Sequence, residues 1–110
     1  MVIMKIEVLE KLESGYVKMD WKSQRHKFGI DDLEGIVDII DNFKSNPSVS
    51  DLVIGKFKTI PSYIYVPHSE WISLLNWICQ KYIDAEIYEK CSRVKELIYL
   101  IKITQITNEI

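Results

Sequence analysis

Alanine and arginine are scarce in this chain of 110 residues. It contains one alanine, four glycines and three prolines, and arginine supplies only two of its 14 basic residues. Apolar residues make up 47% and charged residues 27%, a balance that excludes a disordered tail, a collagen-like chain and a repeat array. The 18 isoleucines and 12 lysines that replace alanine and arginine indicate an AT-rich genome, and we expect an archaeal or viral origin.

Cysteine is equally rare, with only Cys79 and Cys91. The chain has no CxxC pair and no Cys/His cluster, so we expect neither a metal site nor a bound cofactor. If one helix held both cysteines, they would lie about 18 Å apart, far beyond disulfide reach. A bridge would need a chain reversal between them. We therefore predict free, buried thiols and a reducing cytoplasm.

Targeting features are also missing. The first residues do not form a charged segment followed by an apolar one, as a signal peptide would, and no apolar run approaches the roughly 20 residues of a membrane span. We expect a cytoplasmic protein without membrane contact. The formal net charge of −2 excludes a generally basic nucleic-acid binder. The length predicts a single domain over residues 1–110.

Two alternating segments open the chain. Residues 2–13 and 16–28 place apolar and polar residues in turn, with Ser14-Gly15 between them, which predicts a β-hairpin. In this register Val17, Met19 and Trp21 face inward, and Glu7 lies opposite Lys22.

The rest of the chain alternates between helical and strand patterns. Asp31 with Glu34 resembles a capping box and predicts a helix that ends near Asn46-Pro47. Two strands should follow, over 49–57 and over 63–66, and Gly55 in the first marks either a bulge or a close backbone approach. Ser69 should cap a C-terminal helix that is either continuous or broken near Asp84. The tail after Ile98 is open to helix or strand.

These elements predict an α+β domain of two layers. The order is β-β-α-β-β-α, with an antiparallel sheet and room for one extra strand at the end. Several small α+β folds share such an order, so it does not give the function.

An acidic stripe lies on the first predicted helix. Its acids recur every three or four residues and so share one face, which favours contact with an electropositive partner, although a solvated face or a weak divalent-cation site would produce the same pattern. Its members are Asp31, Glu34, Asp38 and Asp41.

Basic and aromatic residues are interleaved along the predicted strands. Such a surface can bind single-stranded nucleic acid, and the alternative is an ordinary strand surface protected by lysine at its edge. The residues expected to bind are Arg25, Lys27, Lys56 and Lys58.

A narrow apolar stripe runs along the last helical segment. It covers about two heptads, so it would either pack on the protein's own sheet or mediate self-association as a homodimer. Its residues are Ile87, Cys91, Val94, Ile98 and Ile101.

Catalytic signals are weak. Asp20 and Lys22 have the acid-x-lysine spacing of some metal-dependent nucleases, but no supporting acid precedes them on a helix. His68 precedes the C-terminal helix without an evident partner for acid–base chemistry. We therefore expect no catalytic residues. The leading hypothesis is a self-associating interaction module whose acidic helix engages a basic partner, such as a regulator or inhibitor encoded by a virus or plasmid. The alternative is a nucleic-acid-binding protein.

Overall fold

The computed structural model describes residues 17–44, 51–56 and 62–109. The predicted strand over 2–13, the turn at Ser14-Gly15 and Lys58 lie outside these residues. In chain order the elements are β1 (Val17–Asp20), α1 (Trp21–Gln24), a 3₁₀ turn η1 (Arg25–Lys27), α2 (Ile30–Phe43), β2 (Asp51–Lys56), β3 (Ser62–Pro67), a second 3₁₀ turn η2 (His68–Glu70), α3 (Trp71–Asp84) and α4 (Tyr88–Glu109).

The described strands form a mixed sheet rather than the predicted antiparallel one. Its order is β1-β3-β2, with β1 parallel and β2 antiparallel to β3. A parallel pair needs a long crossover, and the chain between β1 and β3 supplies one that contains α2. The register of β2 shifts between Val53 and Gly55, where a bulge is one of the two alternatives that the sequence leaves open. The α+β class is confirmed, but the element order is not.

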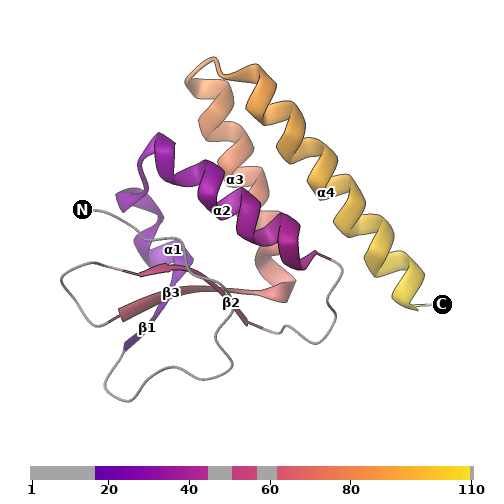
Figure 1. Ribbon diagram of the computed structural model, residues 1–110, viewed down its shortest axis with the longest axis horizontal. Helices are drawn as coiled ribbons and strands as arrows, with labels where there is room; N and C mark the ends of the chain where they lie inside the picture. Colours follow the sequence, from indigo (N-terminus) through magenta and orange to yellow (C-terminus); the bar gives the residue numbers. More distant parts are fainter. Residues whose placement is uncertain (1–16, 45–50, 57–61, 110) are drawn as a thin grey trace.

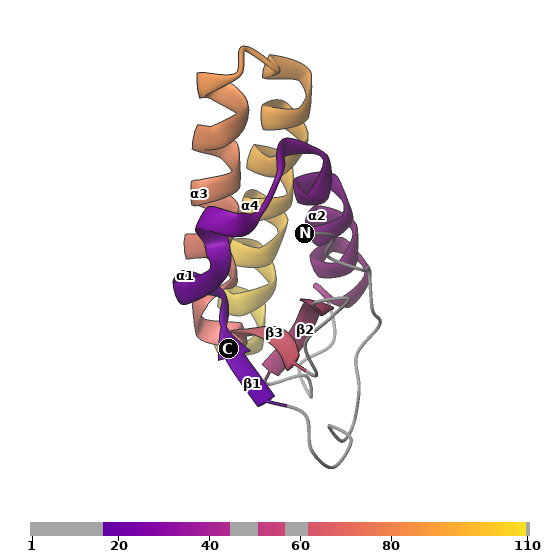
Figure 2. The ribbon, with the colours of Figure 1, turned by 90° about the vertical axis from the view of Figure 1, so that its left-hand side faces the viewer.

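The longer helices form the second layer. In Figure 1, α2, α3 and α4 lie on one side of the sheet, and Figure 2 shows α3 and α4 side by side in opposite directions. A core lies between the sheet and these helices. The sheet contributes Leu52, Ile64 and Val66 to it, and none of the three has exposed surface. Leu33 and Ile40 of α2 and Leu74 and Ile78 of α3 complete the centre of the same core.

The second predicted strand, over 16–28, is a strand only as far as Asp20 and turns helical after it. The strand ends at Asp20, whose carboxylate accepts a hydrogen bond from the Lys22 amide and whose carbonyl accepts one from the Ser23 hydroxyl. Trp21 is buried as predicted, but as the first residue of α1, and Val17 is exposed instead of facing inward. Lys22 pairs with Glu70 at 2.9 Å.

Helix α2 begins earlier than the capping pattern predicts. Gly29 precedes the helix, and Asp32 closes its first turn. The Asp32 carboxylate accepts from the Gly29 amide at 2.7 Å, and the Asp32 amide donates to the Gly29 carbonyl at 3.0 Å. The capping box therefore lies two residues before the predicted Asp31–Glu34 pair.

Helix α3, by contrast, starts one residue later than predicted. Ser69 lies within η2, and the residue before α3 is Glu70, whose side chain makes no capping bond.

The sequence left open whether this region is one continuous helix or is broken near Asp84. The structure has the break, because the chain reverses between α3 and α4. Glu86 adopts a left-handed φ of 60°, and the Ile87 amide donates to the Tyr82 carbonyl at 2.8 Å. The reversal brings the Cα atoms of Cys79 and Cys91 to 4.9 Å, and the two residues form a disulfide. The prediction of free thiols is therefore wrong, and the thiol-based reason for expecting a reducing compartment is lost.

The tail after Ile98 is helical, because α4 continues to Glu109. The alternative of a final strand is wrong. Within the part of the chain that the structure describes, no helix has an apolar stretch long enough to cross a lipid bilayer.

Candidate functional site

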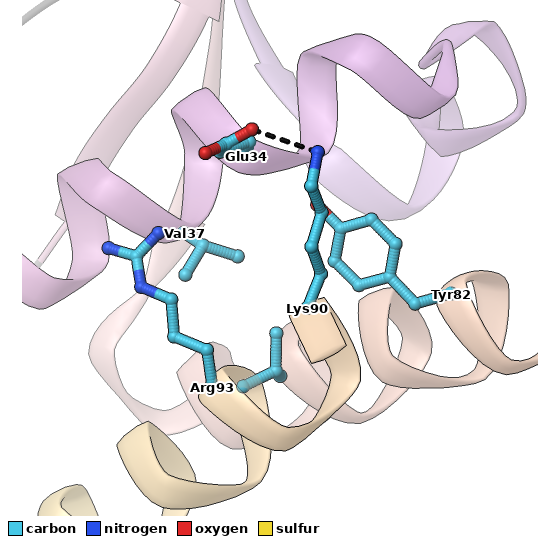
Figure 3. A pocket seen from close by; sticks show the side chains of 6 residues that line it. Glu34, Val37, Tyr82, Lys90 and Arg93 are labelled. Atoms are coloured by element: carbon cyan, nitrogen blue, oxygen red, sulfur yellow. Dashed lines mark hydrogen bonds and ion pairs between the residues drawn. The ribbon is translucent and has the colours of Figure 1, made fainter. Parts of the chain in front are cut away.

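The acidic stripe faces cations of the same chain. Two ion pairs connect α2 to α4: Lys90 Nζ lies 3.0 Å from Glu34 Oε2, and Arg93 Nη2 lies 2.6 Å from Asp38 Oδ1. The same Arg93 nitrogen lies 3.6 Å from Asp41 Oδ2. We call these five residues the ion-pair seam, and Figure 3 shows Lys90 reaching across to Glu34.

Three members of the seam, Lys90, Arg93 and Asp41, have shifted pKa values. The hydrogen bond to Glu34 raises the pKa of Lys90, and the bond to Asp38 raises the pKa of Arg93. A hydrogen bond from Lys44, at 2.7 Å, holds the pKa of Asp41 below its ordinary value, although burial opposes the shift. The lowered pKa keeps the Asp41 carboxylate in its charged form near neutral pH.

One member of the stripe stands apart. Asp31 is exposed, and in the described regions it makes no recorded ion pair. A basic partner at the stripe stays a prediction, and at the other three acids it would compete with Lys90 and Arg93.

The space along the seam is small. A hollow of about 40 Å³ lies beneath the Lys90–Glu34 pair, and Figure 3 shows the Tyr82 ring beside it. Burial raises the pKa of the Tyr82 hydroxyl. A second hollow of about 190 Å³ lies beside Arg93 and Leu100. Both volumes fall below the roughly 300–1,000 Å³ of typical ligand pockets.

The predicted C-terminal stripe lies inside the protein. Cys91, Val94, Ile98 and Ile101 are each at most 8% exposed and belong to the main core, with Ile87 packed at its edge. They cover α3 and the core of their own chain, so they do not present the surface that was expected to mediate self-association.

The opposite side of α4 carries apolar residues in solvent. Six large hydrophobic residues in the described regions are exposed, and four of them belong to α4. Three of these four share the side of α4 away from the core, and we call them the outer face: Tyr88 (60% exposed), Tyr99 (63%) and Ile103 (41%). Leu100 (38%) instead borders the hollow beside Arg93. The sequence shows the i, i+4 spacing of Tyr99 and Ile103. It does not show that this face is the exposed one, because the opposite face of α4 is also apolar.

Cations gather on another side of the molecule, over α1, η1 and α3. The Arg25 guanidinium lies 5.8 Å from the Trp21 ring centroid and 6.0 Å from that of Trp77. Lys81 lies 5.4 Å from the Trp77 centroid, and Lys22 lies 5.9 Å from that of Trp21. We call Lys22, Arg25, Lys81 and Trp77 the cationic face. Of this group, only Arg25 was among the residues expected to bind nucleic acid. Trp77 and Lys81 nevertheless have the i, i+4 spacing that places two side chains together on a helix.

The other predicted basic residues are spread more widely. Lys27 is exposed in η1, and Lys56 ends β2 opposite Tyr63 of β3.

The residues considered for catalysis have local structural roles. Asp20 caps α1 and Lys22 pairs with Glu70, while the His68 ring packs 4.6 Å from that of Trp71. Among the described residues, no cluster of three or more His, Cys, Asp or Glu could hold a metal ion.

The sequence matches no protein-family profile, and neither curated proteins nor solved structures include a detectable relative.

Proposed function

We propose that this protein is a non-enzymatic interaction module that self-associates through the outer face of α4. The observation that carries the proposal is the concentration of exposed apolar residues on this one helix, on the side away from the core. Contiguous exposed apolar patches generally mark interaction sites.

The occupant we propose is a second copy of this chain, because of the charges beside the outer face. At about 100° per residue, Lys95 and Lys102 flank the Tyr88–Tyr99–Ile103 line on one side, and Glu89 and Glu96 flank it on the other. All four are exposed. When two such helices pair in parallel, the lysine flank of each meets the glutamate flank of its partner. An antiparallel pair would instead set like charges together.

The expected dimer is weak. The outer face spans about four turns of one helix, which provides less area than the roughly 1,200–2,000 Å² of a stable interface. We therefore expect exchange between monomer and dimer at micromolar concentrations.

Sedimentation velocity over a range of concentrations tests the proposal. Wild-type protein should show a concentration-dependent dimer, and Tyr99→Gln with Ile103→Gln should remove it without a change in far-ultraviolet circular dichroism. Ile30→Gln is the matched control, because Ile30 is similarly exposed (40%) but lies on α2. A wild-type protein that stays monomeric throughout would contradict the proposal.

The flanking charges test the orientation in the same assay. Lys95→Glu should weaken the dimer, since it faces Glu96 of the partner copy with a like charge. Adding Glu96→Lys to Lys95→Glu should restore it. In an antiparallel pair neither change would have this effect.

A further inference from the structure

The cationic face combines accessible positive charge with an aromatic ring that is not fully buried. Lys22, Arg25 and Lys81 are exposed, and Trp77 is half-buried, whereas Trp21 and Trp71 are at most 1% exposed. The Phe28 ring meets Trp77 edge-on, with centroids 6.0 Å apart. Phe28 thus fixes the indole from one side while Arg25 and Lys81 lie near its faces.

The charges of this face are largely uncompensated. Lys22 has Glu70 at 2.9 Å, but no carboxylate is recorded at ion-pair distance from Arg25 or Lys81 within the described ranges. The nearest acid along α3, Asp84, accepts a hydrogen bond from Gln80. In a protein whose net charge is −2, such a cluster attracts an anion locally although the whole molecule does not.

We propose that the cationic face binds single-stranded nucleic acid. Phosphates attract the lysine and arginine side chains, and an unpaired base offers a flat surface that can stack on an indole. At rest the cations lie over the indole rings, where they are held by weak cation–π attraction. When a strand binds, Arg25 and Lys81 turn to adjacent phosphates and a base takes their place against Trp77. Duplex bases are already stacked on one another, so the ring favours a single strand.

This inference does not rest on self-association, because the outer face of α4 contributes none of its residues. Its test is fluorescence anisotropy of labelled oligo-dT and oligo-U at low and at moderate salt. Wild-type protein should bind at low salt and lose affinity steeply as salt rises. Tryptophan fluorescence should be quenched on binding, since Trp77 is the partly accessible indole.

The decisive variant is Arg25→Gln with Lys81→Gln. It should lower affinity about tenfold or more and reduce the slope of log affinity against log salt by about 1.4, because each lost phosphate contact removes about 0.7 on a single strand. Lys44→Gln with Lys90→Gln is the matched control. It removes the same charge from the residue that follows α2 and from α4, and it should leave affinity within about twofold.

Several results would overturn the inference. These are the absence of oligonucleotide binding at low salt, equal weakening by the two double variants, and binding to anionic phosphatidylserine vesicles but not to oligonucleotides. Trp77→Phe provides a second measurement that keeps an aromatic ring in the same place. It should abolish the quenching while most of the affinity remains, and quenching that persists would also contradict the role of Trp77.

Discussion

The ion-pair seam and the cationic face use the same kinds of charged side chain in opposite ways. In the seam, Arg93 lies between two carboxylates of α2, and its charge is neutralised inside the fold. On the cationic face, Arg25 lies between two indole rings, and no described carboxylate pairs with it. A neutralised charge contributes to stability, whereas an uncompensated charge remains available for a ligand. Local pairing, rather than net charge, therefore distinguishes the seam from the cationic face.

The largest effect should come from releasing α4. Cys79→Ala with Cys91→Ala should lower the free energy of unfolding by roughly 2–4 kcal/mol, because the disulfide restricts the unfolded chain. It should weaken the seam, which depends on α4, and spare the cationic face, which does not. Urea denaturation measures the first effect and oligonucleotide affinity in the absence of denaturant measures the second. If a reducing agent leaves the wild-type urea midpoint unchanged, the disulfide makes no such contribution.

A pair of matched substitutions compares the two arginines directly. Arg93→Met leaves Asp38 and Asp41 without their shared cation and should cost about 1 kcal/mol at low salt, since these side chains are more than a third exposed and solvent screens them. The cost should shrink near 1 M salt, where the Debye length is about 3 Å.

Arg25→Met removes the same charge but should change stability by only a few tenths of a kcal/mol. The weak attraction to the rings is lost, while repulsion between Arg25 and Lys22 is relieved. Urea midpoints of both variants at two salt concentrations provide the measurement. Equal, salt-independent losses would contradict the distinction between the seam and the cationic face.

The sequence predicted parts of the fold whose signals are local. The α+β class and the helix over α2 follow from hydrophobic spacing, and the break before α4 was one of the two alternatives that a polar interruption left open. The α1 turn was missed because Val17, Met19 and Trp21 alternate like a strand, while Trp21, Gln24 and Phe28 equally fit helical spacing. The parallel pairing of β1 with β3 was missed for another reason: alternation shows which face of a strand is apolar, but not which strand lies beside it.

The charge pairing within the site depends on tertiary structure. The spacing from Asp31 to Asp41 correctly placed the acids on one face of a helix, but Lys90 and Arg93 lie more than fifty residues away in the chain. Their approach requires the chain reversal at Glu86. This residue has a left-handed φ, a conformation that usually favours glycine, so the sequence carries no glycine that would signal the turn. The disulfide was missed for the same reason. The distance predicted between the two cysteines assumed one continuous helix, but the chain reverses between them.

The smallest expected effect is the pH dependence of stability at Asp41. It tests whether Lys44 or Arg93 is the more important partner of this carboxylate. Because the hydrogen bond from Lys44 lowers the pKa of Asp41 in the folded state, this carboxylate stabilises the fold above its ordinary pKa of about 4. That stabilisation is lost as pH falls through the folded-state pKa. Asp41→Asn should therefore be less stable than wild type near pH 6, by less than about 0.5 kcal/mol, and the difference should vanish in acid.

The double variant Lys44→Met with Asp41→Asn completes the comparison. If Lys44 supplies the larger share of the shift, Asp41→Asn should have a smaller effect in the Lys44→Met background than in wild type, and a larger residual effect would assign that share to Arg93. Urea midpoints at several pH values, with the pKa of Asp41 followed by carboxyl NMR, give both quantities. An Asp41 pKa that stays low without Lys44 would show that Arg93 alone is enough to lower it. Removing Arg93 should then reduce the free energy of unfolding by more than the about 1 kcal/mol expected above.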